Sequence, residues 1–423
     1  MLQITTLRET PDFVIERLAI KNVNATETVQ AILLADKQKR ELQKALDDNL
    51  SESNNIAREI GNLFKEGKAS EADALKQRTA TLKESAKDLN ENLELASAKL
   101  NDLLVQLPNL PHSSVPPGKH AEHNEVVSQE GDIPTLHAAA VPHWDLAKKY
   151  NLIDFDLGSK ISGAGFPVYR GKGARLQRAL INFFLERGIA AGYEEIQPPY
   201  VVNEDSAYGT GQLPDKEGQM YLANLDKLYL IPTAEVPVTN IYRDVILKPT
   251  DFPVKNVAYS ACFRREAGSY GKDVRGLNRL HQFDKVEIVQ IARPENSYAI
   301  LEEMVMHVTE LLRALGLPFR ILRLCGGDMS FASALTYDFE VFSTAQARWL
   351  EVSSVSNFEA FQANRLKLRF KNETGKTELA HTLNGSALAL PRIMAALLEN
   401  MQVEDGIRIP AILVPYTGFD MIS

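Results

Sequence analysis

Apolar residues recur at seven-residue intervals between Ala25 and Leu107, within a stretch that is otherwise charged and polar. Glycine is rare in this stretch, proline is absent, and Lys, Glu, Asp, Asn, Gln, Leu and Ala dominate, which is typical of long helices. Two registers can be followed along it. The first contains Ile32, Lys39, Leu46, Ser53 and Ile60 with Leu42, Asn49, Ile56 and Leu63, and the second contains Leu75, Leu82, Leu89, Ala96 and Leu103 with Thr79, Ala86, Leu93, Leu100 and Leu107.

The segment Lys65–Ser70 separates the two registers and carries the only turn signal between them. Two seven-residue patterns joined by one short turn predict an antiparallel helical hairpin, a coiled coil with one narrow apolar seam. Each helix of about 33 residues would extend about 50 Å. A coiled coil between two chains is the alternative, but the central turn favours pairing within one chain. Before the hairpin we expect a strand fragment at Leu2–Val14 and a short helix at Val14–Lys21.

A linker rich in Pro, Ser and Gly follows at about residues 108–123. We therefore expect an N-terminal domain at residues 1–110, with the hairpin at about 26–107, and a second domain at residues 111–423. In the second domain strands follow one another in runs with short loops, which favours an α+β domain on a mostly antiparallel sheet. Pro198 and Pro199 favour an edge or interface position for the strand that contains them. The expected helices are Gly173–Arg187, Ser297–Leu315 and Leu388–Met401, and the expected strands are Tyr193–Val202, Leu228–Leu230, Tyr259–Phe263, Val286–Ile291, Phe319–Leu324, Ala334–Phe342, Trp349–Val355, Leu366–Phe370 and Leu379–Leu383.

The 423 residues carry a formal net charge of −8. This charge argues against a general nucleic-acid coat, whose affinity comes from phosphate neutralisation, but it leaves room for a specific nucleic-acid partner on a local basic surface. Two cysteines, Cys262 and Cys325, cannot by themselves form a disulfide framework or a structural zinc site, so we expect no zinc. The sequence has no apolar stretch of about 18 residues and no signal-peptide core, which predicts a cytoplasmic protein that does not bind a membrane.

The segment Tyr259–Glu287 concentrates more chemistry than any other part of the chain. Two strand patterns flank a long polar loop, and a loop of this length is usually either functional or disordered. Arginine forks match phosphate oxygens, an aromatic face stacks on a base, and carboxylates accept from amino groups. The segment therefore suits a polyanion that also carries a flat ring, with a solvated basic loop as the alternative. Its polar and aromatic candidates are Arg264, Arg265, Glu266, Arg275, Arg279, His281, Phe283 and Glu287.

A second candidate segment is Leu383–Asn400. We expect it to pass from a strand through Asn384–Gly385–Ser386 into an apolar helix with Arg392 near its start. A helix N-terminus beside an arginine suits a phosphate. An internal salt bridge of Arg392 is an equally good interpretation of this segment alone.

A third candidate is Glu351–Asn357, which places one acid and three hydroxyls on one expected strand. Such oxygen ligands suit Mg²⁺ shared with nucleotide phosphates, although an ordinary serine-rich strand has the same pattern. Alternation places Glu351 and Ser353 on one face and Ser354 on the other, unless the strand is bulged. The GxxxxGK[ST] and GxGxxG phosphate loops are absent, so common NTPase and dinucleotide folds are not supported.

At these positions the chain resembles the seryl-tRNA synthetases, a family of class II aminoacyl-tRNA synthetases. The resemblance covers nearly the whole chain, and the class I signatures HIGH and KMSKS are absent. It rests on HWDLAKKYNLIDFDLGSKISGAGF at His143–Phe166, TAEVPV at Thr233–Val238, FRREAGSYGKDVRGLNRLHQFDKVE at Phe263–Glu287, EVSSVSNFEAFQANR at Glu351–Arg365 and HTLNGSALALPR at His381–Arg392.

The resemblance implies a homodimer whose catalytic domain is built on six or seven antiparallel strands. Arg175–Tyr200 resembles the first class motif, which forms the subunit interface, Tyr259–Glu287 the second, and Gly385–Asn400 the third. The helical hairpin resembles an arm that binds tRNA held by the partner subunit, and RNA helices are recognised largely by shape and backbone. The implied reaction is ATP-dependent attachment of L-serine to tRNA(Ser) through a seryl adenylate, and to tRNA(Sec) where the host makes selenoproteins.

The resemblance also implies roles for single residues. Arg264, Glu287 and Arg392 are the implied catalytic residues. The implied serine pocket consists of Thr233, Ala234, Glu235, Arg264, Glu287, Asn384 and Ser386, and Glu287 binds the ammonium group. The implied ATP site consists of Arg264, Arg265, Glu266, Arg279, Phe283, Glu351, Val352, Ser353, Ser354 and Arg392, with Mg²⁺ held by Glu351 and Ser354.

Within that ATP site, the resemblance implies that Arg264 contacts the α-phosphate, Glu266 binds the adenine amino group and Phe283 stacks on the adenine. The resemblance places Arg392 against the other face of the adenine ring or at the γ-phosphate. It places Arg279 near the outer phosphates. Arg265 and Arg275 look equivalent to Arg264 by composition, but the resemblance places them in loop or tRNA-facing positions.

Four positions depart from the family's usual pattern. Gly165 and Asn364 stand where arginines are common, and Ala387 and Pro391 replace frequent glycines. We expect these departures to affect tRNA contacts or packing more than catalysis. The alternatives to a synthetase are a catalytically silent or repurposed relative and a structural coiled-coil protein with a globular head; the second explains the hairpin but not the downstream arginines, glutamates and phenylalanine.

Overall fold

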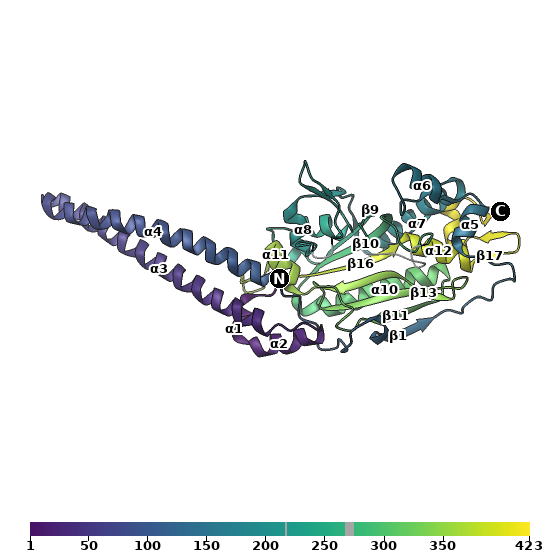
Figure 1. Ribbon diagram of the computed structural model, residues 1–423, viewed down its shortest axis with the longest axis horizontal. Coiled ribbons are helices and arrows are strands. Elements are labelled where there is room, and N and C mark those ends of the chain that lie inside the picture. Colours follow the sequence, from purple (N-terminus) through teal and green to yellow (C-terminus); the bar gives the residue numbers. More distant parts are fainter. Residues whose placement is uncertain (216–217, 267–274) are drawn as a thin grey trace. The chain divides into compact units, whose positions relative to one another are not determined.

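The computed structural model describes residues 1–215, 218–266 and 275–423 (Figure 1). Part of the loop in Tyr259–Glu287, residues 267–274, lies outside this described part. The chain divides into two compact units, one formed by residues 2–19 and 23–108 and the other by residues 1, 20–22 and 109–423.

The smaller unit consists of helices: α1 (Ile4–Glu9), α2 (Pro11–Ile20), α3 (Thr26–Lys65) and α4 (Ala69–Leu104). The predicted strand at Leu2–Val14 is wrong, because this stretch forms α1 and the first turn of α2. Leu7, Val14 and Leu18 are fully buried at helical spacing. Packing of an apolar helix face therefore outweighs the local strand propensity of this stretch. Arg8 of α1 also forms an ion pair with Asp36 of α3 at 3.0 Å.

The predicted hairpin is confirmed, since α3 and α4 are joined by a turn at residues 66–68. The helices have 40 and 36 residues and so are longer than expected. Every predicted seam position is buried or half-buried, and along residues 37–65 of α3 no other position is shielded from solvent. The seven-residue pattern therefore gave the contact face of each helix correctly.

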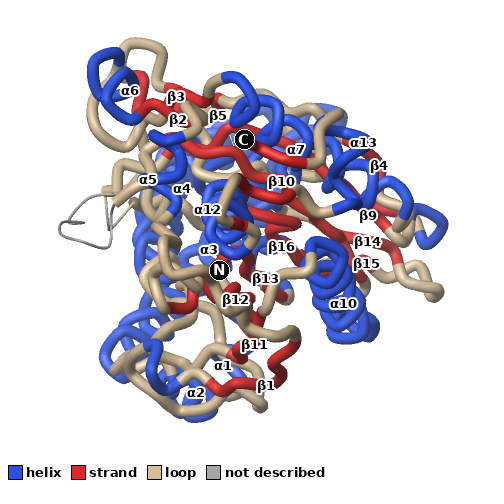
Figure 2. The backbone as a smooth tube through the Cα atoms, turned by 90° about the vertical axis from the view of Figure 1, so that its right-hand side faces the viewer, coloured by secondary structure: helices blue, strands red, loops and turns tan. Residues whose placement is uncertain are grey.

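The larger unit is built on an eight-stranded sheet, in place of the six or seven strands implied by the resemblance. The strand order is β1-β11-β12-β13-β16-β10-β9-β4, and every neighbouring pair is antiparallel except β4 with β9 (Figure 2). The strands are β1 (Glu125–Glu130), β4 (Glu194–Glu195), β9 (Val254–Phe263), β10 (Gln282–Ala292), β11 (Phe319–Arg323), β12 (Leu335–Ser343), β13 (Arg348–Asn357) and β16 (His381–Ala389).

The predicted strand Tyr193–Val202 is broken by Pro198 and Pro199 into β4 and the separate β5 (Val201–Val202). Proline cannot donate to a ladder, and β4 indeed lies at the sheet edge, as the prolines predicted. The segment Leu366–Phe370 forms a helix end and the short β14 (Arg369–Lys371). The remaining small strands are β2 (Ile153–Asp154) with β3 (Val168–Tyr169), β6 (Leu222–Ala223) with β7 (Leu228–Leu230), β8 (Ile246–Leu247), β15 (Thr377–Leu379), β17 (Gln402–Val403), β18 (Gly406–Arg408) and β19 (Met421–Ile422).

Three long helices cover one face of the sheet: α7 (Gly171–Ala190), α10 (Ser297–Leu315) and α12 (Leu390–Asn400). Their buried apolar side chains form a single core with alternate strand residues such as Val286, Ile288 and Val355. Because side chains alternate along a strand, the polar residues between these positions point to the opposite face. The remaining helices are α5 (His143–Lys149), α6 (Phe155–Ile161), α8 (Glu204–Thr210), α9 (Glu235–Asn240), α11 (Ala360–Leu366) and α13 (Val414–Thr417).

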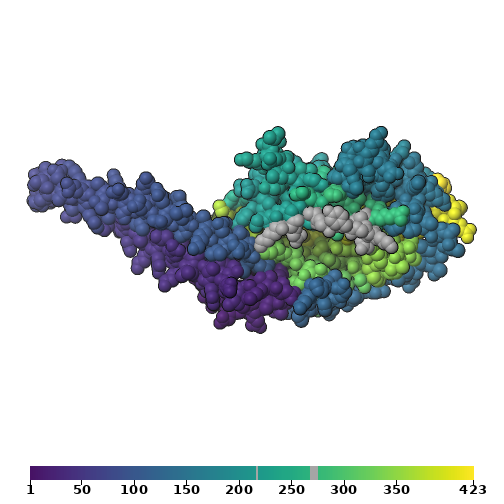
Figure 3. Space-filling view, in the orientation of Figure 1, coloured from purple at the N-terminus to yellow at the C-terminus, as the bar shows by residue number. Residues whose placement is uncertain are grey.

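Segments distant in sequence meet on one surface of the larger unit. In the space-filling view, teal residues from the middle of the chain lie beside lime-green residues of its last third (Figure 3). Within the described residues, no helix has both the length and the apolar character needed to cross a membrane.

The seam of the helical hairpin generates the first prediction. Asn49 is buried on α3, and its side-chain oxygen accepts no hydrogen bond within the described part of the chain. Replacing it by leucine removes this unpaired group and should stabilise the helical unit by about 1 kcal/mol. The measurement is urea unfolding followed by helical circular dichroism. Asn54→Leu, at an exposed position of the same helix, is the control and should leave the midpoint unchanged; a lower midpoint for Asn49→Leu would contradict the assignment.

Candidate active site

The first part of the site, the predicted serine pocket, is a cluster of buried polar side chains on the sheet face opposite the three long helices. Strand pairing places Glu287 of β10 opposite Ala258 of β9 on one side and Ser386 of β16 on the other. Thr233 and Glu235, at the start of α9, complete the pocket, and Thr233 donates from Oγ1 to Glu287 at 2.9 Å. The structure therefore brings together the predicted serine-binding residues Thr233, Ala234, Glu235, Glu287, Asn384 and Ser386, all of them buried.

Lys285 lies at the centre of this pocket, and our reading of the sequence missed it. It is buried, forms an ion pair with Glu287 and donates to Thr233 Oγ1 at 2.8 Å. Lysine is almost never fully buried unless it is paired. The available signal was its position two residues before Glu287 in a strand that is otherwise mostly apolar, since such spacing places both side chains on one face.

Gln362 of α11 is a second residue that we did not single out. Its amide donates to Glu235 Oε1 at 2.6 Å and to the main-chain oxygen of Thr210 at 3.0 Å, and it accepts from Thr382 at 2.6 Å. Gln362 thereby ties the buried carboxylate of Glu235 to the end of α8 and to β16. It lies inside one of the long family-like strings, which was the only signal for it.

The carboxyl of Glu235 has an unusual pKa. Burial, together with the nearby carboxylate of Glu287, raises the pKa of Glu235 to about 7, against the opposing effect of hydrogen bonds from Gln362 and Asn384 and the charge of Lys285. The pocket thus contains two buried carboxyl groups and one ammonium group. A second cation placed here would be stabilised by the carboxylate that Lys285 does not neutralise.

The second part of the site lies at the ends of β9 and β10. Arg264 follows β9 directly, is exposed, and its guanidinium lies 5.2 Å from the centre of the Phe283 ring. Its main-chain N–H donates to the oxygen of His281 at 2.9 Å, which continues the β9–β10 pairing. The Arg264 guanidinium and the face of the Phe283 ring therefore lie side by side. The exposed Arg265 is instead fixed through its main chain to Gln219.

Glu266 and Arg279 form an ion pair across the described ends of the loop. Glu266 has a positive φ of 50°, a backbone conformation that non-glycine residues rarely adopt and that turns the chain at this point. The structure therefore joins two residues that the resemblance assigned to opposite ends of ATP. Each would have to leave the other in order to bind the nucleotide.

A bulge in β13 aligns the two predicted magnesium ligands. The pairing of β12 with β13 shifts register between Phe339 and Glu340, so that Asp338 is opposite Ser354 while Glu340 is opposite Glu351. Asp338 and Glu340 are two residues apart and share a face. Glu351 and Ser354 therefore share that face as well, which the simple alternation of an unbulged strand would have prevented.

The side chains of Val352 and Ser353, between Glu351 and Ser354 on β13, do not point to the face that carries Glu351 and Ser354. Val352 belongs to the apolar core, and Ser353 is buried and donates to the main-chain oxygen of Ser386 at 2.5 Å. Only their main chain could contact a nucleotide. On the facing strand, burial and the charge of nearby Glu351 raise the pKa of Asp338 well above its ordinary value.

Arg392 lies in the first turn of α12, as predicted. It donates from Nε to the main-chain oxygen of Asn278 at 3.0 Å and from Nη1 to that of Glu351 at 2.8 Å, and its closest approach to the Glu351 carboxylate is 3.8 Å. The strand before α12 is longer than expected, because Asn384, Gly385 and Ser386 all lie within β16. The pairing of β16 with both β10 and β13 extends the strand through them.

One departure from the family pattern has a clear structural setting. Gly165 has a φ of +83°, and a Cβ on it would lie 2.4 Å from the ring of His281. A larger residue cannot fit while His281 keeps this position, with its Nδ1 2.8 Å from the Tyr221 hydroxyl. Asn364 donates from its side-chain amide to the main-chain oxygen of Met1 at 3.0 Å. Nothing in the structure explains Ala387, and the proline at 391 occupies the first turn of α12, where a missing N–H costs nothing.

The sheet and the two-part site define a class II aminoacyl-tRNA synthetase. The model of the tRNA synthetase class II core domain (G, H, P, S and T) matches residues 221–401, and that of the seryl-tRNA synthetase N-terminal domain matches residues 1–111. The structure of the Pyrococcus horikoshii seryl-tRNA synthetase complexed with ATP superposes with a TM-score of 0.92 at 34% identity, covering 100% of this chain and 99% of that chain.

Curated relatives identify the amino acid. The serine–tRNA ligase of Salinibacter ruber is 51% identical over 425 residues, covering 100% of this chain and 99% of that protein. The serine–tRNA ligase of Chlorobaculum parvum is 46% identical and covers 100% of both chains. This chain therefore belongs to the serine–tRNA ligases, the enzymes that use ATP to join serine to tRNA.

The raised pKa of Glu235 generates the second prediction. Its folded pKa of about 7 lies above the ordinary 4.5, so the folded state holds an extra proton between these values and stability falls as pH rises through this window. Glu235→Gln removes the titration and should stabilise the protein at pH 8 by up to roughly 3 kcal/mol, with little difference at pH 4.5. Denaturant unfolding at both pH values measures this.

The matched control is Glu404→Gln, which changes an exposed carboxylate on the same domain. It should show no pH-dependent gain. A Glu235→Gln difference of equal size at both pH values would mean that Glu235 does not titrate in this range.

Proposed function

We propose that this chain forms seryl adenylate from serine and ATP in the pocket and nucleotide surface described above, and then transfers the seryl group to tRNA. The observation that carries this assignment is the charge balance of the pocket. Among the residues that the structure describes, Glu235 and Glu287 face a single buried ammonium group, that of Lys285. The ammonium group of serine would bring the second positive charge to these carboxylates.

The two parts of the site would hold the two substrates end to end. Serine would bind beside Thr233 and Glu287 with its ammonium on Glu287, and ATP would bind with adenine on Phe283 and its α-phosphate on Arg264. Because β10 carries both Glu287 and Phe283, one strand sets the spacing of the two substrates. Positioning of this kind is the main contribution that such a site can make, since the serine carboxylate is already ionised and needs no protein nucleophile.

In the first step the serine carboxylate would attack the α-phosphorus in line and diphosphate would leave. Negative charge builds on the phosphoryl oxygens in the transition state, and fixed cations stabilise it. Arg264 would act at the α-phosphate, while Arg279 and Arg392 would act at the outer phosphates or the ring. In the second step the terminal hydroxyl of tRNA would attack the adenylate carbonyl and AMP would leave.

Magnesium fits the residues on β13. Glu351 and Ser354 offer oxygen donors on one face, beside Asp338, whose pKa is raised by burial and nearby acids. Oxygen ligands of this kind are those that Mg²⁺ prefers, usually together with substrate phosphates. When bound, the ion would neutralise charge on the phosphate oxygens. Across the described residues no set of three or more His, Cys, Asp or Glu side chains is arranged to hold a metal alone, which favours a site completed by ATP.

Selection of serine follows from the same pocket. A site that hydrogen-bonds the serine hydroxyl leaves buried polar groups unpaired when alanine enters, which opposes alanine strongly. Asn384 and Ser386 would bound the hydroxyl side. Threonine would be excluded by lack of room for its methyl group.

The remaining assignments rest on the family resemblance. We propose that residues 1–110 bind tRNA through the hairpin, that residues 111–423 catalyse both steps, and that the protein is a cytoplasmic homodimer. A monomer mass by light scattering would contradict the dimer. Use of tRNA(Sec) stays a prediction, which charging of a tRNA(Sec) transcript tests.

The role of Arg264 generates the third prediction. Arg264→Ala removes the cation at the α-phosphate and should lower serine-dependent ATP–pyrophosphate exchange by about 100-fold or more, with a much smaller change in serine binding. Arg408→Ala, which removes an exposed arginine elsewhere, is the control and should keep full exchange. An Arg264→Ala enzyme with near-normal exchange would defeat the assignment.

A further inference from the structure

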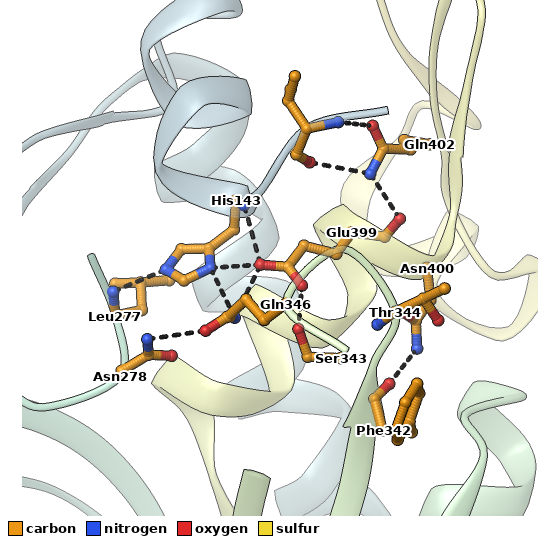
Figure 4. A network of polar contacts seen from close by, with 11 residues as sticks. His143, Leu277, Asn278, Phe342, Ser343, Thr344, Gln346, Glu399, Asn400 and Gln402 are labelled. Atoms are coloured by element: carbon orange, nitrogen blue, oxygen red, sulfur yellow. Dashed lines mark hydrogen bonds and ion pairs between the residues drawn. The ribbon is translucent and has the colours of Figure 1, made fainter. Parts of the chain in front are cut away.

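A buried polar network lies at the C-terminal end of α12, outside the groups assigned above (Figure 4). Its centre is the pair His143, at the start of α5, and Glu399, on α12, and both side chains are fully buried. Glu399 Oε1 accepts from His143 Nδ1 at 2.7 Å, from the His143 main-chain N–H at 2.9 Å and from Gln346 at 2.9 Å. Its other oxygen accepts from the Ser343 hydroxyl.

The hydrogen bonds fix the protonation of the pair. The main-chain N–H of Leu277 points to His143 Nε2 at 2.8 Å, and because an N–H can only donate, Nε2 must be the unprotonated nitrogen. The ring proton therefore lies on Nδ1 and is donated to Glu399. Burial raises the pKa of Glu399, but the hydrogen bonds from His143 and Ser343 outweigh it and leave this pKa below its ordinary value. Glu399 is thus a buried carboxylate with four donors.

The network reaches the nucleotide surface through two adjacent residues. His143 accepts the Leu277 N–H, and Gln346 accepts from the side chain of Asn278 at 3.0 Å. The main-chain oxygen of Asn278 in turn accepts from Arg392 Nε at 3.0 Å. Arg392 and Glu399 are seven residues apart on α12, which places them on one face of the helix. Residues 277–278 are thereby held by Arg392 at one end of that helix face and, through His143 and Gln346, by Glu399 at the other end.

Gly276 is shaped for the same contact. It has a φ of +67°, and a Cβ on it would lie only 2.3 Å from His143 Nε2. The backbone can approach the imidazole only because position 276 has no side chain. Next to it, the guanidinium of Arg275 lies 4.7 Å from the centre of the Trp144 ring. Arg275 and Leu277, on either side of Gly276, therefore both contact the first turn of α5.

We propose that His143 and Glu399 form a positioning unit that fixes the main chain of Leu277 and Asn278, and through it sets Arg392 and the adjacent Arg279 for the phosphates of ATP. Neither residue touches a substrate. The inference rests on the proposed function, because the roles of the two arginines are themselves proposed. Its expected signature is weaker use of ATP with unchanged use of serine.

Two substitutions of His143 separate its two contacts. The amide of asparagine lies near the position of Nδ1, so His143→Asn keeps a donor for Glu399 and loses the acceptor for Leu277. The amide of glutamine reaches the position of Nε2, so His143→Gln keeps an acceptor for Leu277. We expect His143→Asn to raise the KM for ATP in serine-dependent pyrophosphate exchange about tenfold, and His143→Gln about threefold. The KM for serine should stay within about twofold in both.

Gln346→Met provides a second route if His143→Asn fails to fold. Gln346 is half-buried in the turn between β12 and β13, and its amide nitrogen also lies 3.5 Å from His143 Nδ1. Gln346→Met removes the bridge between Glu399 and Asn278 but leaves the hydrogen bonds of His143 with Glu399 and Leu277 in place. It should raise the KM for ATP in the same direction. The control is His381→Asn, the same substitution at a histidine of β16 whose Nδ1 lies 2.8 Å from the Ser297 hydroxyl and which forms no hydrogen bond with residues 275–279.

Hydrogen exchange of the peptide that covers residues 275–281 gives a direct readout, and it should rise in His143→Asn and not in His381→Asn. The proposal is overturned if His143→Asn and Gln346→Met lower the melting temperature while both KM values stay unchanged, or if the KM values for ATP and serine rise in parallel. Absence of serine-dependent exchange in the unmodified protein would instead overturn the proposed function.

Discussion

The pairing of β10 with β9 on one side and β16 on the other is the constraint on which the whole site depends. It places Glu287 opposite Ser386, and it places Phe283 beside the end of β9, where Arg264 begins the loop. A slip of one residue would turn every side chain of β10 to the other face and exchange Lys285 and Glu287 for the core residues Val286 and Ile288. The apolar core under α7, α10 and α12 opposes such a slip, so hydrophobic packing on one face fixes polar geometry on the other.

The charges of the site follow from that geometry. Lys285 and Glu287 are buried together, and breaking such a pair by removing one partner is costly, because it leaves an uncompensated charge. Outside the pocket, Glu266 forms an ion pair with Arg279, and Glu351 forms one with Arg392. At the proposed ATP site a nucleotide would have to compete with these ion pairs, and the net gain on binding would be smaller than the sum of the new contacts.

Most of the helices and strands could be predicted from the sequence, because a repeating pattern of apolar residues indicates directly which positions are buried. The heptads gave the seam of α3 and α4 position by position, and long apolar strands and helices were located to within a few residues. The failures are of another kind. The bulge that aligns Glu351 with Ser354, the continuation of β16 through Gly385, and the burial of Lys285 and Gln362 all depend on strand pairing between distant segments. The stretch Leu2–Val14 was misread as a strand because packing of α1 on α3 decides its form, whereas the short helix expected at Val14–Lys21 is present as α2.

The most direct test is a crystal structure of the protein with a non-hydrolysable seryl-adenylate analogue, such as a serylsulfamoyl adenosine. The account predicts the seryl ammonium within hydrogen-bond distance of Glu287, about 3 Å, and the adenine against the Phe283 ring. It also predicts that Arg264 turns from that ring to the sulfamoyl group in the place of the α-phosphate. An analogue bound with its adenine away from Phe283, or with its ammonium away from both Glu287 and Glu235, would contradict the account.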